Sequence, residues 1–264
     1  MSRIEQFFNE RKAKNEKALI PYITAGDPDL KTTEKILKAL IDSGADMIEL
    51  GVPFSDPMAD GPTIQAASQR ALKNNFSLQN IFSLVTRVRT FSSIPIILFG
   101  YYNPFFQYGL KRLSRDAQQA GVDGFLIVDL PPEEAGPIKE AANAAGLDII
   151  FLLAPTSTDE RMKRVAEMAS GFVYYVSVTG VTGARKSLDA MIGSSIDKIR
   201  TFTKLPIGIG FGISTPEQVR EVARYSDAVI VGSALIKVIE DNLGDPDMVQ
   251  KVGEFMSSLK EATR

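Results

Sequence analysis

Eight short apolar runs, rich in β-branched residues, recur along this chain and constrain its fold more than any other feature. Segments with helical amphipathic spacing separate them, and several begin with Ser, Thr or Asp and end with Gly, the residues that cap helices. Runs that are apolar almost throughout are typical of strands buried on both faces, as in a parallel sheet. The eight runs are residues 18–26, 46–54, 94–102, 124–131, 148–155, 171–180, 205–213 and 227–235.

Eight strand–helix units predict an α/β fold, a single (β/α)8 TIM barrel formed by residues 1–264 as one domain. The amphipathic segment "MSRIEQFFNERKAKNEKAL" adds an N-terminal helix, and residues 55–93 and 181–204 are predicted as long loops after strands 2 and 6. The alternative is a doubly wound open sheet. Its dinucleotide fingerprint is missing after the first strand, where the sequence reads "TAGDPDLK", so the barrel is favoured.

The composition narrows the chemistry. The chain has neither His nor Cys, which excludes Ser–His triads, thiol nucleophiles and zinc sites built from these residues. Acid–base chemistry near neutral pH is left to Asp, Glu, Tyr or Lys. No Lys stands at a predicted strand end, and the nearest one, Lys186, lies well out in a connection. This argues against Schiff-base chemistry, which needs a desolvated Lys beside the substrate.

Charge and hydropathy bear on partners and location. The net charge of −2 and the pI near 5.4 give no reason to expect nucleic acid or an anionic membrane as a partner. No apolar run approaches the length of a membrane span, and the N-terminal segment lacks the apolar core of a signal peptide. The predicted location is the cytoplasm.

The stretch "ELGVPFSDPMADGP" places Glu49 at the end of an apolar run and holds Asp56 and Asp60 in a proline-stiffened loop. Glu49 alternates with Ile48 and Leu50, so it is predicted to point into the barrel mouth. Burial there would raise its pKa and make it a proton shuttle. The alternative for Glu49 is a structural carboxylate satisfied by backbone groups or a Lys.

The other acidic residues at predicted strand ends have simpler explanations. Asp60 precedes Gly61, which is common turn chemistry, so the alternatives for Asp60 are a turn residue and a catalytic one. Asp56 fits a cap or a partner contact, and Asp27 and Asp129 fit loop caps or rim packing. No D-x-D cluster supports a carboxylate magnesium site, and no metal site is predicted.

Two glycine-rich turns, in "GIGFGIST" and "VIVGSAL", follow the last two predicted strands. Glycine lets backbone N–H groups approach phosphate oxygens, and the helix after the second turn adds partial positive charge at Gly232 and Ser233. Barrels often bind phosphate at this place, so Gly212, Gly232 and Ser233 are candidate ligands, with Gly183 as a further N–H donor. The alternative is that these glycines only form tight turns.

Aromatic and aliphatic residues from different strands are predicted to line a flat cavity, although ordinary barrel core explains each of them singly. They are Tyr22, Phe99, Tyr101, Leu126, Leu152 and Tyr174. The segment "YYNPFFQYG" after the third strand crowds five aromatics into nine residues. It either tucks them onto the barrel or forms an apolar rim patch at a subunit interface.

Several long motifs, in order and over nearly the whole chain, resemble those of the tryptophan synthase alpha chain family. They are "PYITAGDP", "ELGVPFSDPMADGPTIQ", "VDLPPEE", "SVTGVTGAR", "GFGIST" and "VGSALI". The resemblance implies a lyase that cleaves indole-3-glycerol phosphate by a retro-aldol reaction to indole and glyceraldehyde 3-phosphate. It also implies a beta chain partner in an alpha2beta2 assembly, to which indole passes through a tunnel. Pyridoxal phosphate is then expected only in that partner, and no cofactor is expected in this chain.

Carried over by position, the family's catalytic residues are Glu49, Asp60 and Tyr174. Thr182 matches the threonine that closes over the site, and Tyr22 stands where some relatives have Phe. The phosphate contacts fall on Gly183, Phe211, Gly212, Gly232 and Ser233. The face that docks the beta chain matches Pro53, Asp56, the stretch Asn103–Phe106 and "PPEE".

This chemistry suits a chain without histidine. Protonating indole C3 and removing the glycerol hydroxyl proton are two transfers that one carboxyl of raised pKa, Glu49, can make in turn. An ionised Asp60 would stabilise the positive character of the indole N–H. Three rivals remain: another phosphate-binding barrel enzyme such as an isomerase, a non-catalytic subunit that docks through "YYNPFF", and a stand-alone lyase that releases free indole.

Overall fold

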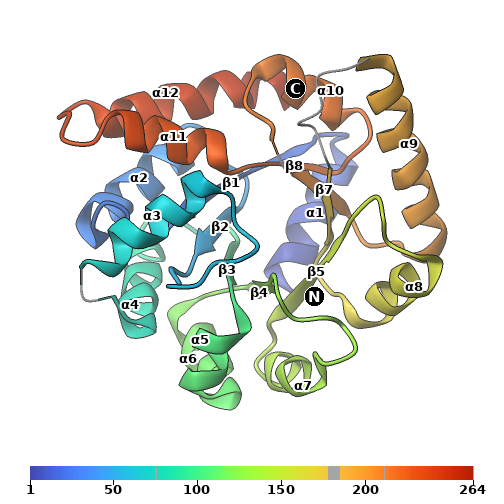
Figure 1. The fold of residues 1–264 in the computed structure, drawn as a ribbon, viewed down its shortest axis with the longest axis horizontal. Helices are drawn as coiled ribbons and strands as arrows, with labels where there is room; N and C mark the ends of the chain where they lie inside the picture. The colour runs from blue at the N-terminus through green and yellow to red at the C-terminus, as the bar shows by residue number, and fades with distance from the viewer. Residues whose placement is uncertain (75, 178–184, 211, 264) are drawn as a thin grey trace.

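Eight parallel strands form a closed barrel in which each strand pairs with its neighbours in chain order and β8 pairs with β1 (Figure 1). The structure is a computed structural model that describes residues 1–74, 76–177, 185–210 and 212–263. The predicted (β/α)8 fold is confirmed. The strands are β1 (Ala18–Thr24), β2 (Ile48–Gly51), β3 (Ile96–Gly100), β4 (Gly124–Ile127), β5 (Asp148–Leu153), β6 (Val173–Val176), β7 (Ile207–Gly210) and β8 (Ala228–Val231).

Helices surround the barrel, except that the first helix lies across one end of it (Figure 1). They are α1 (Arg3–Ala13), α2 (Leu30–Asp42), α3 (Pro62–Leu72), α4 (Leu78–Val88), α5 (Tyr102–Tyr108), α6 (Leu110–Ala120), α7 (Gly136–Ala144), α8 (Asp159–Met168), α9 (Arg185–Phe202), α10 (Pro216–Ala223), α11 (Ser233–Asp241) and α12 (Met248–Lys260), with a final 3₁₀ turn, η1 (Glu261–Thr263). No helix in the described ranges is both long and apolar enough to cross a bilayer.

All eight predicted strands are present, but each is shorter than its apolar run. The run over residues 46–54, for example, contains only the four residues of β2, because apolar side chains continue into the loops at the barrel mouth. The connections predicted as long loops are largely helical. Residues 55–93 contain α3 and α4, and residues 181–204 contain α9. The aromatic segment after β3 is also helical and forms α5.

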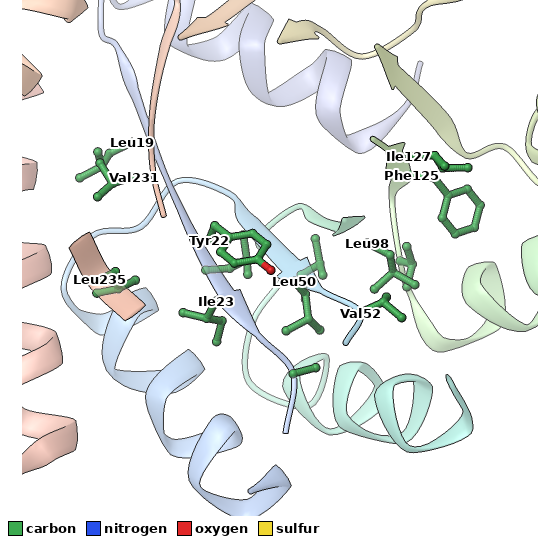
Figure 2. Close-up of a cluster of buried hydrophobic side chains, with 14 of the residues drawn as sticks. Leu19, Tyr22, Ile23, Leu50, Val52, Leu98, Phe125, Ile127, Val231 and Leu235 are labelled. Carbon is green, nitrogen blue, oxygen red and sulfur yellow. The ribbon is translucent and has the colours of Figure 1, made fainter. Parts of the chain in front are cut away.

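The core has two layers because inward and outward side chains alternate along each strand. The larger cluster lies between the strands and the helices, and Figure 2 shows part of it, including Leu50, Leu98 and Phe125. The smaller cluster fills the barrel and includes Ile4 and Phe8 of α1. The Phe8 ring centroid lies 5.7 Å from that of Phe172. The predicted N-terminal helix therefore covers the N-terminal end of the barrel, which leaves the C-terminal end for a site.

Aspartates next to strand starts fix the register at the covered end. Asp46 accepts the Leu19 N–H (2.8 Å), and Asp123 accepts the Ile96 N–H (2.7 Å). Both are buried and both have cationic partners: Asp46 pairs with Lys260, and Asp123 with Arg89 at 2.9 Å. Buried carboxylates with such partners anchor neighbouring strands and are not free for chemistry.

Candidate active site

A cavity of about 460 Å³ opens at the C-terminal end of the strands. It brings together many of the residues that the sequence singles out: Tyr22, Glu49, Asp60, Phe99, Leu152, Tyr174, Gly212, Gly232 and Ser233. Three other predicted residues, Thr182, Gly183 and Phe211, lie outside the described residues. Within the described part of the chain, no three Asp, Glu, His or Cys side chains are grouped to hold a metal ion.

Glu49 comes from the middle of β2 and lines the cavity, whereas its neighbours Ile48 and Leu50 belong to the layer between strands and helices. Its side chain is almost fully buried, with 1% of the residue exposed. Glu49 Oε1 has no hydrogen-bond partner among the described residues. Burial raises the pKa of this carboxyl to about 8, because a charge without a partner is poorly solvated there. Glu49 is therefore mostly protonated at neutral pH.

Asp60 lies in the loop that leads into α3. Its N–H donates to the Pro57 carbonyl (3.0 Å), and its own carbonyl accepts from Gln65 Nε2 (2.9 Å). Burial raises the pKa of the Asp60 carboxyl to about 6, and a hydrogen bond from Tyr101 partly opposes this rise. Asp60 is thus mostly ionised at pH 7 while Glu49 is mostly neutral. Two carboxyls whose pKa values are pushed apart by their environments can take the two roles of charge stabiliser and proton carrier.

Tyr101, predicted as a wall of the pocket, is not one of the described residues that line the cavity. It is buried behind the Asp60 loop, where its hydroxyl accepts the Ala59 N–H at 2.9 Å. Because that N–H occupies an acceptor position of the hydroxyl, the phenolic proton remains free for the Asp60 carboxylate. Tyr101 therefore positions Asp60 and favours its ionised form.

Two tyrosines form opposite parts of the wall. The Tyr22 ring packs edge-on against Phe99, with ring centroids 5.0 Å apart, and its hydroxyl lies 3.4 Å from Thr24 Oγ1. Tyr174 stands on β6 and interacts electrostatically with Glu49. Burial raises the pKa of both phenols far above the ordinary value of tyrosine, so both stay neutral at any working pH.

The N-terminus of α11 forms the far end of the cavity. Its N-cap residue is Gly232, and no side-chain cap is present among the described residues, so the first backbone N–H groups of this helix can serve a ligand. The neighbouring helix α10 differs, because Thr215 and Gln218 form a capping box that satisfies its own first turn. Of the two glycine-rich turns, the one at Gly232 and Ser233 therefore has the clearer capacity to bind an anion. Gly212, with φ +77°, lines the same cavity.

Among the described residues, a second predicted wall residue does not line the cavity, and several that do line it were not predicted. Leu126 lies in the inner core, one layer below the cavity, and Val128 lines the cavity instead. Val176 and Ile230 also contribute. The period of two correctly predicts which residues point inward, but it does not tell how high in the barrel each one lies.

The fold and this cavity define the class of the protein as a (β/α)8-barrel enzyme with carboxyl groups for acid–base work beside an anion-binding helix end. A family model described as "Tryptophan synthase alpha chain" matches residues 8–264. Tryptophan synthase alpha chains from Geotalea uraniireducens and Geobacter sulfurreducens are 55% and 53% identical over 264 and 262 residues. The alignments cover 100% and 99% of this chain and 98% and 99% of those relatives.

Solved structures agree. Tryptophan synthase subunit alpha from Legionella pneumophila superimposes with a TM-score of 0.92 at 40% identity, covering 100% of this chain and 98% of that one. A chain of Mycobacterium tuberculosis tryptophan synthase gives a TM-score of 0.89 at 34% identity, covering 100% and 98%. The chain belongs to the tryptophan synthase alpha chain family. Members of this family are lyases that cleave indole-3-glycerol phosphate in tryptophan biosynthesis, and the family implies a beta chain partner.

Proposed function

We propose that Glu49 is the proton shuttle of this lyase and Asp60 its stabilising anion. The observation that carries this assignment is the pair of carboxyls in one cavity, one with a pKa raised to about 8 and the other to about 6. At a pH between these two pKa values, the site holds one proton on Glu49 and one negative charge on Asp60. The cleavage of indole-3-glycerol phosphate requires both at once.

The reaction proceeds by two proton transfers. Protonated Glu49 donates its proton to C3 of the indole, which leaves an iminium-like ring and a Glu49 carboxylate. That carboxylate then removes the proton of the adjacent glycerol hydroxyl, and the carbon–carbon bond breaks. The electron pair of this bond returns to the indole ring while the hydroxyl carbon becomes the aldehyde of glyceraldehyde 3-phosphate. Glu49 ends protonated, as it began.

Asp60 acts on the other side of the ring. Protonation at C3 places positive charge on the indole nitrogen, and a carboxylate facing the N–H stabilises that charge in a cavity of low polarity. The bond from Tyr101 lowers the pKa of Asp60 and so keeps it ionised. Tyr174 remains a neutral phenol beside Glu49 and supplies an aromatic wall, with Tyr22 and Phe99 opposite.

The phosphate group is assigned to the N-terminus of α11, with Gly212, Gly232 and Ser233 as ligands. The first turn of α11, which lacks a side-chain cap among the described residues, supports this assignment. The sequence adds Gly183 and Phe211 to the same end and Thr182 as the closing residue, all outside the described residues.

We assign the partner role to a tryptophan synthase beta chain in an alpha2beta2 assembly, with pyridoxal phosphate carried by that partner only. The assigned docking face contains Pro53, Asp56, Asn103 and Phe106. Phe106 is 56% exposed, and Met58, two residues after Asp56, is 86% exposed. Large exposed apolar side chains beside a site mouth are typical of an interface. We also assign the protein to the cytoplasm and describe it as a single domain. The closure of all eight strands into one barrel supports the single domain.

One measurement separates this assignment from a stand-alone lyase. Release of glyceraldehyde 3-phosphate from indole-3-glycerol phosphate is followed with and without a cognate beta chain. Slow cleavage alone and a large increase with the beta chain support a subunit whose site is completed by docking. Fast cleavage without any response identifies a lyase that releases free indole. Absence of cleavage in both mixtures, with folded protein, overturns the assignment.

A further inference from the structure

A buried ion pair lies at the end of β1, apart from the two reacting carboxyls. Arg70 of α3 binds Asp27 with two parallel hydrogen bonds, Nε to Oδ1 at 2.7 Å and Nη2 to Oδ2 at 2.9 Å. The Asp27 side chain is fully buried, and that of Arg70 is mostly buried. The planar guanidinium matches a carboxylate in this geometry and holds it in a fixed orientation.

The same guanidinium reaches a third element. Arg70 Nη1 donates to Glu240 Oε1 of α11 at 3.0 Å. The C-terminal end of α3 is further tied to the strand end, because Asn74 Nδ2 donates to the Pro28 carbonyl. Arg70 therefore joins the end of β1, helix α3 and helix α11, which lie side by side in Figure 1.

Both joined helices begin at the active site. Helix α3 starts directly after Asp60, with Gly61 as its N-cap, and α11 starts at Gly232 and Ser233. At about 1.5 Å per residue, Arg70 lies roughly 12 Å along α3 from its first residue, and Glu240 lies roughly 10 Å along α11 from Ser233. The link thus sits at a similar distance from the start of each helix.

We propose that Arg70 is a positioning residue that sets the separation between the indole-binding and phosphate-binding ends of the site. The proposal rests on the function assigned above, in which Asp60 faces the indole and α11 the phosphate. A substrate that must reach both ends gains from a fixed spacing, because binding of its first end places the second at high effective concentration. Separate fragments of the substrate gain nothing from that spacing.

This difference gives the test. Binding is measured calorimetrically for three probes: indole, glycerol 3-phosphate, and an unreactive indolyl-propyl phosphate that joins the two ends. The variant Glu240→Ala removes the contact between Arg70 and α11 at a partly exposed position, together with an exposed ion pair to Lys237 on α11 itself. The matched control is Asp241→Ala, which removes an exposed ion pair to Lys237 on the same helix without reaching α3.

In Glu240→Ala, the Kd of the joined ligand is expected to rise about tenfold, while each fragment stays within about twofold of wild type. The KM for indole-3-glycerol phosphate rises in parallel, and Asp241→Ala binds all three probes like wild type. Equal weakening of the joined ligand and of glycerol 3-phosphate would overturn the proposal, because it indicates local damage to the phosphate site. Unchanged binding of the joined ligand would overturn it as well.

Variants of Arg70 extend the test. Arg70→Lys keeps the charge but cannot hold two carboxylates through a fork, so it should show the same selective loss. Arg70→Met leaves Asp27 as an unpaired buried charge, so the double variant Asp27→Asn with Arg70→Met removes both charges and keeps the measurement possible if the single variant does not fold. A wild-type protein that fails to bind the joined ligand would overturn the assigned function itself, and that outcome is distinct from a failure of the spacing role alone.

Discussion

Tyr174 lies directly against Gly210: a Cβ atom at position 210 would be only 2.0 Å from the Tyr174 hydroxyl oxygen. Tyr22 and Gly51 repeat this relationship, with a corresponding distance of 2.3 Å. The register explains the repetition. Tyr174 pairs with Gly208 and Tyr22 pairs with Glu49, so each ring reaches two residues further along the next strand. Each phenol can fill the wall only because its neighbour has no side chain.

The first prediction follows from this contact. Gly210→Ala, and separately Gly51→Ala, should force the facing tyrosine ring into the cavity. We expect kcat/KM to fall at least tenfold and the free energy of unfolding to fall by about 1–3 kcal/mol, the usual cost of overpacking. Steady-state kinetics and urea unfolding measure the two effects. Gly136→Ala is the control, because a Cβ there meets no atom of the described residues within 4 Å. Wild-type kinetics in Gly210→Ala would contradict the geometry.

The second prediction concerns Glu49. Glu49→Gln keeps the shape of the side chain but cannot give up and recover a proton, so kcat should fall by about 10²–10⁴, the usual contribution of general acid–base catalysis. Binding of the indolyl-propyl phosphate should stay close to wild type, because the carboxyl is mostly neutral before the reaction. A single-turnover assay measures the cleavage step. Turnover near the wild-type rate would remove Glu49 from the mechanism.

The third prediction concerns stability and pH. The folded-state pKa of Glu49 is raised from 4.5 to about 8. The folded state therefore holds the proton more tightly than the unfolded chain does. The tighter proton binding contributes to the free energy of unfolding. Its contribution is complete below about pH 4.5 and is lost as pH rises toward 8, at up to about 1.4 kcal/mol per pH unit. Glu49→Gln has no such proton, so its stability relative to wild type should increase across this window. If the free energies of unfolding of the two proteins changed with pH in parallel, this would argue against a neutral Glu49.

The sequence predicts the barrel well because each strand is buried on both faces and therefore leaves a local signal. It also predicts the inward direction of Glu49, which needs only the alternation along β2. The position of Tyr101 behind Asp60 is not predictable in this way, because the hydrogen bond from the Ala59 N–H to the Tyr101 hydroxyl joins residues 42 positions apart. Arg70 gives even less signal. An arginine in an amphipathic helix usually faces solvent, and only the closed barrel brings it to Asp27 and Glu240.

The fourth prediction is the pH dependence of kcat/KM. Activity requires an ionised Asp60, with a pKa of about 6, and a protonated Glu49, with a pKa of about 8. The profile should be bell-shaped, with its maximum between these values. Asp60→Asn should lower the maximum and abolish the acidic limb while the basic limb remains. An acidic limb that persists unchanged in this variant would assign it to another group.

The fifth prediction tests Tyr101 as the support of Asp60. Tyr101→Phe removes the hydroxyl that accepts the Ala59 N–H and donates to the Asp60 carboxylate. Loss of a hydrogen bond to the charged form raises the pKa of Asp60, so the acidic limb of kcat/KM should move to higher pH. Relative to wild type at the same pH, kcat/KM should fall about tenfold near pH 6 and recover in part near pH 8, because most of Asp60 is ionised there despite its higher pKa.

Tyr108→Phe is the matched control for this experiment. It removes a tyrosine hydroxyl that donates to a carboxylate, Asp116 at 2.8 Å, on the outer helices and away from the cavity. The control should keep the wild-type pH profile, since Asp116 takes no part in the chemistry. A loss in Tyr101→Phe that is the same at every pH would show that Tyr101 only packs against the loop. A shifted acidic limb separates control of the Asp60 charge from packing, because packing alone does not move a titration.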